Sequence, residues 1–527
     1  MIMRLPDIKE TPIDKVIGWI DPIRAVQRRH ARTVLAMTGG YEGARKDRRG
    51  LKEYNPQGGS ADSDINMDLS TLRNRSRDLA RNNPIGGGAI HTAVNNVVGT
   101  GLSLNARVDR TVLGMGEEET KAFEQAAERG FRLWAEECDL ERGVTFSDLQ
   151  ELAFRSTLES GDVLVLMPYL QRAGDAFGLK LQVVEGDRLS NPNYMCDSVT
   201  LSGGVELDEF GAPIRYHVMH AHPGDIKTGL IRKWDAYAAF TDDGRRRVLH
   251  LYRKLRPGQH RGVPYLAPVI EVLKQLGRYT DAEVMAAVVS GMFTVFIKTE
   301  PGTGLNVTDL LAADGKTASS DGDIGLGYGA MVDLKPGESV EDANPGRPNQ
   351  AFDPFVMALC RQVGMALELP YEVLVKHFTA SYSAARAALL EAWGFYRARR
   401  AWLVRQLCRP VYEAWMWEAV ARGYLYAPGF TSDPQIRQAY LQAEWIGPTQ
   451  GQIDPVKEVQ AARERLALKL TTRSQECITL IGDDWETKVP QIRREEELVG
   501  AVQAKGSAAQ PADAPPDAPD NGDQEKE

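Results

Sequence analysis

Three closely spaced histidines, His217, His220 and His222, come nearest to a metal-binding pattern in this sequence. The surrounding residues 214–219 have the composition of a strand, and alternation along a strand would place His217 on the opposite face from the other two. His220 and His222 could share a site, but they lie beside Pro223-Gly224, where a turn with exposed imidazoles is much more common than a metal centre. The sequence also lacks an HExxH pair. We therefore predict neither a metal site nor a cofactor.

Glycine-rich and serine-rich stretches raise the question of nucleotide binding or nucleophilic catalysis. A Walker loop requires Gly five residues before its Gly-Lys-Thr, and Gly315-Lys316-Thr317 has Leu310 at that position. The run Gly86-Gly87-Gly88 follows a helix-like segment rather than a strand, which argues against a phosphate-binding loop. Ser381 and Ser383 lie outside any GxSxG motif and are better explained as helix caps. These patterns predict a protein that is not an enzyme.

The composition is that of a large globular protein. The chain has 527 residues, of which 43% are hydrophobic and 26% charged, so more than one packed region is expected. No apolar run reaches the roughly 18–20 residues of a membrane-spanning helix, and acidic and basic residues interrupt any secretory pattern at the start. Five widely spaced cysteines without a CxxC pair favour buried thiols in a reducing cytoplasm. A net charge of −9 argues against tight DNA binding but suits a conduit through which DNA slides.

Both ends of the chain differ from its middle. Residues 1–55 are basic, and Trp19, Pro22 and Gly39-Gly40 interrupt any long helix, so we expect an irregular arm that is either solvated or in contact with DNA, scaffold or a neighbouring subunit. Residues 507–527 are rich in Pro, Ala and Asp and have almost no large apolar side chains. Such a segment cannot bury enough surface to fold, so we expect a disordered acidic tail.

The part between these ends shows the periodicities of an α+β protein. Helical spacing is found in residues 66–98, 117–137 and 146–160, and strand patterns in 163–169, 179–184, 214–219 and 248–252. A long helix is predicted from Pro268 to about Gly291, followed by a strand-like run over residues 292–298. An insert with short strands, such as residues 330–334, precedes a second helix that Asp353 caps and that ends before Pro370.

A loop at residues 371–382 is predicted to lead into a third strong helix. Ser381 or Ser383 is expected to cap this helix, and Pro410 to kink or restart it. Large aromatic side chains in this part of the chain supply apolar area for helix packing: Trp393, Phe395, Tyr396, Trp402, Trp415 and Trp417.

Several short motifs, taken in order, resemble those of the lambda-type portal proteins of tailed bacteriophages. They span roughly residues 60–450, and each is modest alone but specific in combination. They are Arg77-Asp78-Leu79-Ala80-Arg81-Asn82-Asn83-Pro84 with Ala89-Ile90 and Val97-Val98-Gly99-Thr100-Gly101; Arg256-Pro257-Gly258-Gln259-His260-Arg261-Gly262-Val263-Pro264; Asp333-Leu334-Lys335-Pro336-Gly337-Glu338; and Leu369-Pro370-Tyr371-Glu372 with Ser381-Tyr382-Ser383-Ala384-Ala385-Arg386.

The resemblance implies an elongated subunit of a closed ring of about twelve copies at one capsid vertex. It divides the chain into an arm (1–55), a wing (56–263), stem helix 1 (264–291), a clip (292–351), stem helix 2 (352–369), a tunnel loop (370–384), a helical inner wing and crown (385–506) and a tail (507–527). It further implies a channel for packaging and ejecting double-stranded DNA, with the terminase large subunit, a capsid or scaffold protein and a head-tail connector as partners. The subunit would belong to the virion and be assembled in the host cytoplasm.

Within the tunnel loop and the helix after it, Lys376, His377 and Arg386 are the candidates for contact with DNA phosphates. The alternative is that they are ordinary solvated or intramolecularly paired side chains. Family members usually have an acidic residue and two serines around the tyrosine motif, whereas here Lys376-His377-Phe378 precedes it and Ala384 replaces the second serine. The main alternative for the whole chain is a head-tail adaptor or capsid-associated protein without a channel, and a phage hydrolase is a more distant one.

Overall fold

The computed structural model describes residues 12–37, 42–44, 49–51, 53–226, 232–291, 295–299, 338–342, 351–378, 381–451 and 454–507. The chain divides into two compact units, Met1–Ser60 and Ala61–Glu527. Three predictions fall outside the described residues: the strand at 330–334, the Gly315-Lys316-Thr317 sequence and the tail beyond residue 507. No helix in the described part is long and apolar enough to cross a lipid bilayer.

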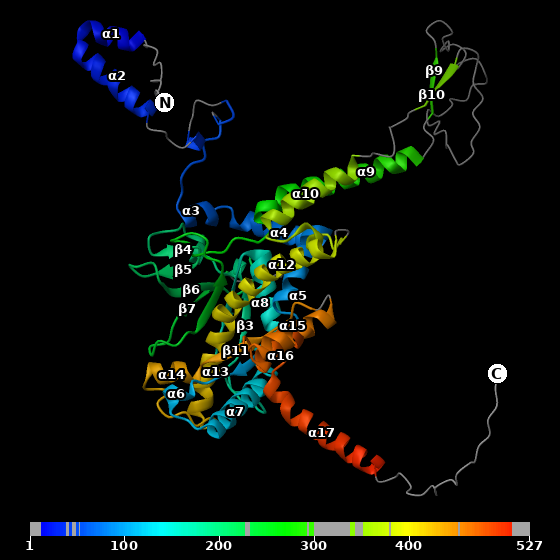
Figure 1. Ribbon diagram of the computed structural model, residues 1–527. Helices are drawn as coiled ribbons and strands as arrows, with labels where there is room; N and C mark the ends of the chain where they lie inside the picture. Colours follow the sequence, from blue (N-terminus) through cyan, green and yellow to red (C-terminus); the bar gives the residue numbers. More distant parts are fainter. Residues whose placement is uncertain are drawn as a thin grey trace, which may run out of the picture. The chain divides into compact units, whose positions relative to one another are not determined.

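The first unit contains two helices, α1 (Pro12–Ile20) and α2 (Pro22–Met37), and the short 3-10 turn η1 (Glu42–Ala44) (Figure 1). Asp21 separates the two helices and caps α2, because its Oδ1 accepts hydrogen bonds from the backbone N–H groups of Ile23 and Arg24, both at 3.1 Å. The prediction of an irregular arm is therefore wrong over residues 12–37. Pro22 does end the first helix, but it also suits the first turn of the next.

Helices of the second unit begin with α3 (Ala61–Asn66), α4 (Leu69–Asn82) and α5 (Pro84–Val97). Asn83 starts α5 by accepting hydrogen bonds from Ile85 N at 3.1 Å and Gly86 N at 2.8 Å, with Pro84 in the first turn. The following helices are α6 (Arg110–Leu113), α7 (Glu117–Ala135) and α8 (Phe146–Ser160). The predicted helical regions at 66–98, 117–137 and 146–160 are confirmed.

The strands form four antiparallel sheets in the described residues. A three-stranded sheet has the order β3–β2–β8, with β2 (Asp162–Leu166) buried along its whole length between β3 (Gln182–Glu185) and β8 (Val248–Tyr252). A four-stranded sheet contains β4 (Leu201–Ser202), β5 (Val205–Leu207), β6 (Pro213–Met219) and β7 (Trp234–Ala238) in that order. Short 3-10 turns η2 (Gly186–Arg188) and η3 (Pro192–Tyr194) follow β3. The α+β prediction is confirmed.

The two remaining sheets are two-stranded antiparallel pairs. The pair β1 (Ser103–Ala106) and β11 (Ala443–Ile446) joins segments far apart in sequence, so β11 is a strand within the region predicted to be helical. The pair β9 (Val295–Thr299) and β10 (Glu338–Asp342) comes from the insert between the two long helices. The strand predicted at residues 292–298 thus corresponds to β9.

The long helices that flank this insert are α9 (Ile270–Gly291), preceded by the 3-10 turn η4 (Ala267–Val269), and α10 (Phe352–Ala366). They pack through Tyr279, which stacks on Phe352 with ring centroids 5.6 Å apart and meets Phe355 edge-on at 5.0 Å. The predicted N-cap of the second helix is wrong: α10 begins one residue before Asp353, which lies in the first turn and there suits the helix dipole.

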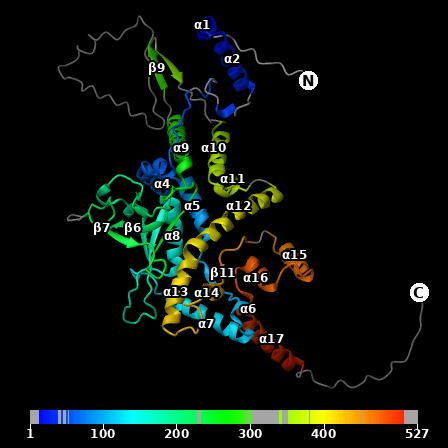
Figure 2. The same cartoon turned by 90° about the vertical axis from the view of Figure 1, so that its left-hand side faces the viewer.

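The C-terminal half is mainly helical (Figure 2). After α11 (Tyr371–Leu374) and α12 (Tyr382–Leu403), a π-helical turn η5 (Val404–Cys408) leads without a break into α13 (Arg409–Ala421). The kink or restart predicted at Pro410 thus takes the form of a π-helical turn just before that residue. The last helices are α14 (Pro434–Tyr440), α15 (Pro455–Ala467), α16 (Arg473–Ile481) and α17 (Trp485–Ser507).

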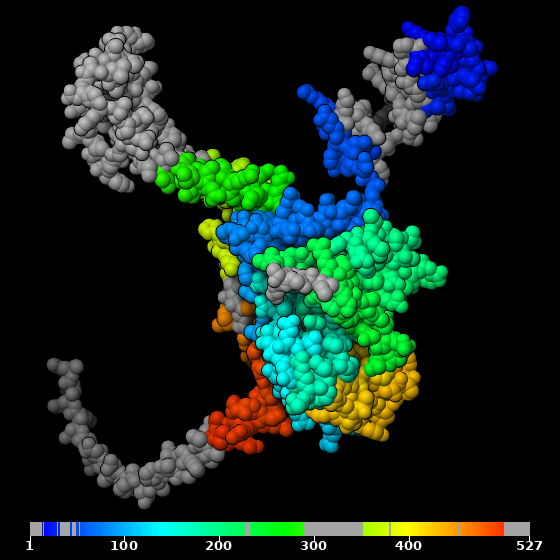
Figure 3. Space-filling model, turned by 180° about the vertical axis from the view of Figure 1, so that it is seen from behind, coloured from blue at the N-terminus to red at the C-terminus, as the bar shows by residue number. Residues whose placement is uncertain are grey.

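Aromatic side chains from both halves of the second unit form the centre of its core. Phe131 of α7 lies between 5.0 and 5.8 Å from the rings of Trp134, Phe146, Tyr412, Trp415 and Trp445. On the face shown in Figure 3, the segments from α4 to β8 form one continuous surface, coloured blue through green. Four of the five cysteines are buried as predicted, but Cys196 is exposed, so that prediction is wrong for Cys196.

Candidate channel segment and its supporting ion cluster

The segment that leads from α10 to α12 contains the residues predicted to contact DNA. It begins with a tight reversal, in which Leu369 N donates to Gly364 O at 2.9 Å and Glu368 has a φ of +56°. A Cβ on Gly364 would lie 2.6 Å from the carbonyl oxygen of Leu369, so only glycine permits this close approach. The predicted loop at 371–382 is not wholly irregular, because α11 occupies its first four residues.

The structure places Lys376 and His377 together on the turn that ends α11, and both side chains are exposed. Lys376 adopts a φ of +55°, and His377 N donates to Glu372 O at 3.1 Å. Arg386 is not brought to this turn: it lies on α12, half-buried, beside Lys457 in a groove of about 390 Å³. Among the residues that the structure describes, none of the three predicted cations forms an ion pair.

Ser381 occupies the N-cap position of α12, as predicted, but its hydroxyl does not cap the helix. Instead, the hydroxyl lies 3.1 Å from that of Ser383. The helix start therefore lacks the side-chain cap that the sequence suggested.

Buried polar groups fix the start of this segment. The hydroxyl of Tyr265 donates to the carbonyl oxygen of Leu367 at the end of α10. The guanidinium of Arg399, which is buried, lies 3.7 Å from the Glu368 carboxylate and 4.8 Å from the centre of the Phe395 ring. Burial lowers the pKa of Arg399 to about 10, so this side chain remains charged at neutral pH.

A second arginine of α12 holds the C-terminal end of α5. Arg400 donates from Nε to Val97 O at 3.0 Å and from a terminal nitrogen to Asn96 O at 2.8 Å. These carbonyl groups have no partner within their own helix, and a cation near them also compensates the helix dipole. Arg400 thereby joins α12 to the N-terminal helices.

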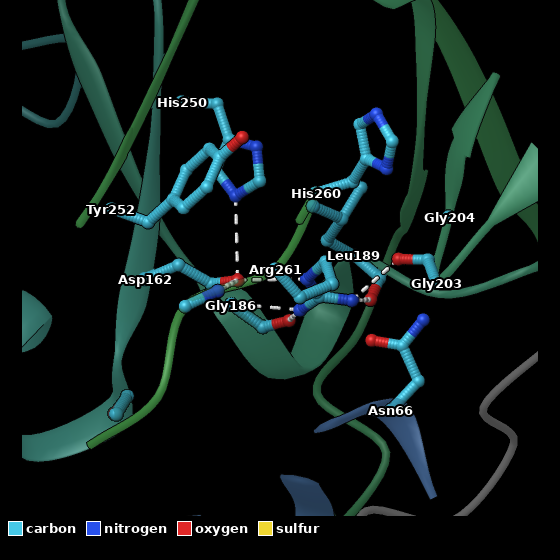
Figure 4. Close-up of polar contacts among 12 residues, drawn as sticks. Asn66, Asp162, Gly186, Leu189, Gly203, Gly204, His250, Tyr252, His260 and Arg261 are labelled. Carbon is cyan, nitrogen blue, oxygen red and sulfur yellow. Dashed lines mark hydrogen bonds and ion pairs between the residues drawn. The ribbon is translucent and has the colours of Figure 1, made fainter. Parts of the chain in front are cut away.

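An ion cluster around Asp162, at the start of β2, connects the three-stranded sheet to the loop before α9 (Figure 4). Asp162 is fully buried and accepts hydrogen bonds from Arg261 Nε at 2.7 Å, from Gly262 N at 3.1 Å and from Arg73. His250 Nε2 lies 3.3 Å from the same carboxylate. Burial alone would raise the pKa of Asp162, but Arg261 and Arg73 hold this pKa well below its ordinary value.

Arg261 also links the cluster to the backbone of three other residues through hydrogen bonds. Besides Asp162, its guanidinium donates to Gly186 O at 2.6 Å, to Leu189 O at 2.8 Å and to Gly203 O (Figure 4). The neighbouring Gly262 packs backbone to backbone against Gly161. A Cβ on Gly262 would overlap the carbonyl group of Gly161, so only glycine fits at this position. The chain that continues into α9 is consequently fixed to the sheet.

Sequence reasoning missed Asp162, Arg73 and His250. A weak signal was present, since Asp162 is a carboxylate placed directly before the apolar strand residues Val163-Leu164-Val165. Arg261 belongs to a motif that resembles the portal family, but its local sequence does not predict that it is the centre of a hydrogen-bond network. The motif residues Asp333 to Gly337 lie outside the described residues.

The three closely spaced histidines lie in separate pairs with carboxylates. His217 Nε2 is 3.3 Å from Glu206, His220 Nε2 is 2.6 Å from Asp235, and the His222 ring is 3.5 Å from Glu185. In the described ranges, no cluster of three or more His, Cys, Asp or Glu side chains has the arrangement of a metal site. Each of these three histidines therefore contacts a different carboxylate.

Comparison with known proteins identifies the family to which the motifs point. The model of the lambda family of phage portal proteins matches residues 47–400, which is well over half of the chain. The chain is similar to portal protein B of Escherichia phage lambda, with 27% identity over 486 residues that cover 88% of this chain and 90% of the relative.

The chain is also similar to a second named relative and to one chain among solved structures. The portal protein of Escherichia phage N15 is 28% identical over 488 residues, covering 88% of this chain and 91% of the relative. Among solved structures, a chain from the neck of a native GTA particle, computed with C12 symmetry, aligns with a TM-score of 0.45 and 14% identity over 79% of this chain and 94% of that chain. On the strength of the family match, the chain belongs to the lambda family of phage portal proteins.

Proposed function

We propose that this chain is the ring subunit of a phage portal, through which double-stranded DNA enters the capsid and later leaves it. The observation that carries the proposal is the family match over residues 47–400, together with the alignment of 88% of the chain with two named portal proteins. In this proposal about twelve copies form a closed ring at one capsid vertex of the virion. The ring first binds the terminase large subunit and then the head-tail connector, and it contacts the capsid or scaffold protein.

The described helices and strands support a division of the chain into the regions of a portal subunit. Residues 56–263 act as the wing, 264–291 and 352–369 as the two stem helices, and 292–351 as the clip. Residues 370–384 form the tunnel segment and 385–506 the inner wing and crown, while 1–55 and 507–527 are the terminal arm and tail. The pairing of α9 with α10, and of β9 with β10 between them, agrees with this division.

Exposed apolar side chains on the stem helices support assembly into a ring. Val284, Met285 and Val288 of α9 are 57%, 62% and 47% exposed, and Met365 of α10 is 83% exposed. A single subunit gains nothing from exposing these residues, whereas head-to-tail packing against the next copy would bury them.

The net charge supports a channel that guides DNA without holding it. Twelve copies would carry a formal charge of 12 × (−9) = −108, so most of the assembly repels DNA phosphates. A few cations can still guide the backbone without reading bases. Lys376 and His377, exposed on the turn after α11, are the proposed contacts, and Arg386 in its groove on α12 is the third.

Electron microscopy of the purified protein tests the ring. We expect class averages that show a closed ring with a central hole wide enough for a duplex. Because some ring proteins need scaffold, the same experiment is repeated with scaffold protein added. An assembly that stays without a pore in both conditions would contradict the proposal and favour an adaptor protein.

Replacement of Lys376 by Ala tests the DNA contact. We expect K376A to form normal rings but to package and eject DNA less efficiently, since one guiding cation per subunit is lost. Lys121→Ala is the matched control, because Lys121 is an exposed lysine on α7 that lies beside Glu117. Unchanged packaging and ejection in K376A would refute the role of Lys376.

A further inference from the structure

A cationic pocket lies between strands β6 and β8 and the π-helical turn η5, away from the tunnel segment. It has a volume of about 250 Å³, and its lining includes Arg246, Lys254 and Arg405 near the surface and Tyr216, His250 and Tyr252 deeper inside. No Asp or Glu is among the residues that line it. We propose that this pocket binds a small oxyanion of the phosphate class, such as inorganic phosphate or pyrophosphate.

The first argument is that the three cations lack counter-charges. In the described part of the chain, none of Arg246, Lys254 and Arg405 forms an ion pair, although Arg246 lies over the Phe240 ring at 5.4 Å. The neighbouring Arg245 differs from them, since its Nε lies 2.8 Å from the Asp243 carboxylate. Like charges that converge on one concavity repel each other unless an anion enters it.

Arg215, which belongs to β6 itself, shows the same contrast. Its guanidinium lies 3.3 Å from the carboxylate of Glu206 on the adjacent strand. Arg215 does not line the pocket and has a carboxylate partner, whereas Arg246, Lys254 and Arg405 line it and have none among the described residues. Three positive charges are therefore available to a ligand.

The second argument is that the floor of the pocket is rigid and offers hydrogen-bond donors. The His250 ring lies 4.6 Å from the Tyr252 ring and 5.5 Å from the Tyr216 ring, and its Nε2 faces Asp162 (Figure 4). Burial raises the pKa of Tyr216, so its hydroxyl keeps its proton and can donate to an anion. The charge of Asp162 does not oppose an anion, because Arg73 and Arg261 neutralise it.

The remaining charged groups near the pocket are already occupied. His260 also lines it, but its Nδ1 lies 2.7 Å from Asp62 and its Nε2 3.1 Å from Gly211 O. Asp62 is therefore paired as well. The unpaired groups are the three cations, and guanidinium groups in particular match the geometry of a phosphate.

The third argument concerns the π-helical turn that carries Arg405. A π turn inserts an extra residue into a helix and is frequent at functional sites. In η5, Leu407 and Cys408 are buried in the core while Arg405 and Gln406 are exposed and line the pocket. The turn thus supplies polar side chains to the pocket without breaking the helical connection between α12 and α13.

The pocket favours a free anion over the backbone of a duplex. Its inner residues are buried below a concave surface, whereas a duplex presents its phosphates on a broad convex one. A free phosphate or pyrophosphate can reach both the cations and the tyrosine hydroxyl. Pyrophosphate and a short DNA duplex, used as separate probes, distinguish binding of a free anion from binding of a nucleic-acid backbone.

Calorimetric titration of the full-length chain tests the proposal, with pyrophosphate as the probe and sodium chloride at equal ionic strength as the reference. We expect saturable binding of pyrophosphate, and Arg246→Gln and Arg405→Gln should each weaken it by more than about tenfold, since a hydrogen bond to a charged group is lost. Arg409→Gln is the matched control, because Arg409 is exposed near the same turn but does not line the pocket.

Three outcomes would overturn the proposal. Heat effects that chloride reproduces would show a general salt response, and equal affinity in R246Q, R405Q and R409Q would place the anion elsewhere. Binding of a short DNA duplex but not of pyrophosphate would assign the pocket to nucleic acid. Circular dichroism of each variant confirms that the fold is intact, and Arg246→Lys should restore part of the affinity.

Discussion

Replacement of Asp162 by Asn removes the negative charge at the centre of the buried ion cluster while preserving the size of the side chain. The carboxylate contacts Arg261, Arg73, His250 and the backbone N–H of Gly262. An amide can accept some of these hydrogen bonds, but its NH2 group would face donors. Asp162→Asn should therefore destabilise the packing of the sheet against the start of α9.

The hydrogen bonds that Arg73 and Arg261 keep in Asp162→Asn determine how much folding stability is lost. Loss of one partner of a buried ion pair typically costs about 3–5 kcal/mol. Arg73 keeps its hydrogen bond to Ser160 O at 2.8 Å, and Arg261 keeps those to Gly186 O and Leu189 O. Neither guanidinium is left without acceptors, so we expect the lower end, about 3 kcal/mol, which lowers the folding equilibrium constant by roughly a hundredfold.

Urea unfolding of the full-length chain, followed by tryptophan fluorescence and circular dichroism, measures this change. Asp243→Asn is the control, because Asp243 is an exposed carboxylate that pairs with Arg245, and its loss should hardly move the midpoint. The double variant Asp162→Asn with Arg73→Met should lose less stability than the two single changes added together. If D162N and D243N unfold at the same urea concentration, the cluster does not stabilise the fold as we argue.

Three further changes have definite expected results. Burial lowers the pKa of His250 below its ordinary value of 6.5, so below that pH the unfolded chain binds a proton that the folded chain does not. Stability should fall as the pH drops through this value, and His250→Gln should flatten the fall in pH-dependent urea unfolding. Arg400→Ala should cost about 1–3 kcal/mol in thermal unfolding, because two hydrogen bonds to the end of α5 are lost, while Arg397→Ala on the exposed face of α12 should change little. Gly262→Ala should sharply reduce the yield of soluble protein, because the new Cβ would overlap an opposing backbone carbonyl, whereas Gly277→Ala, with open space around it, should not. A soluble yield of G262A equal to that of G277A would contradict this reading of the contact.

Local periodicity allowed most of the regular elements to be predicted. The strand at 248–252 and the helix end at Gly291 have the predicted bounds. These elements show apolar residues at a regular spacing, and that spacing is itself the cause of their burial. The same reasoning located the π-helical turn just before Pro410, because proline cannot continue a helix without a change in its hydrogen bonds.

Helix ends and long-range contacts could not be predicted in the same way. Asp353 has the residue type of a cap, but Ala351 occupies the N-cap position, so the helix starts one residue before Asp353. The partners of Asp162 are 89 and 99 residues away in sequence at Arg73 and Arg261, and nothing in their local sequence indicates that they meet. Only the fold brings these three side chains together.

The buried loop before α9 explains why one motif shared with the portal family is so polar. Gln259 is 1% exposed, and its Oε1 accepts hydrogen bonds from Leu255 N at 2.7 Å and Arg256 N at 3.1 Å, while its Nε2 donates to Arg261 O at 2.7 Å. The Gln259 side chain thus supplies the hydrogen-bond partners that the backbone of a loop does not find in regular secondary structure. It also holds Arg261 in position to reach Asp162.

The same loop determines how α9 leaves the sheets that precede it. Fewer than ten residues separate Arg261 from the start of α9 at Ile270, so the orientation of the helix at its first turn follows from the Asp162 cluster. If α9 lines a channel, as proposed, forces from moving DNA reach the wing through this short connection. A cluster of buried ion pairs suits that position better than apolar packing, because its hydrogen bonds are directional and resist sliding of one element over another.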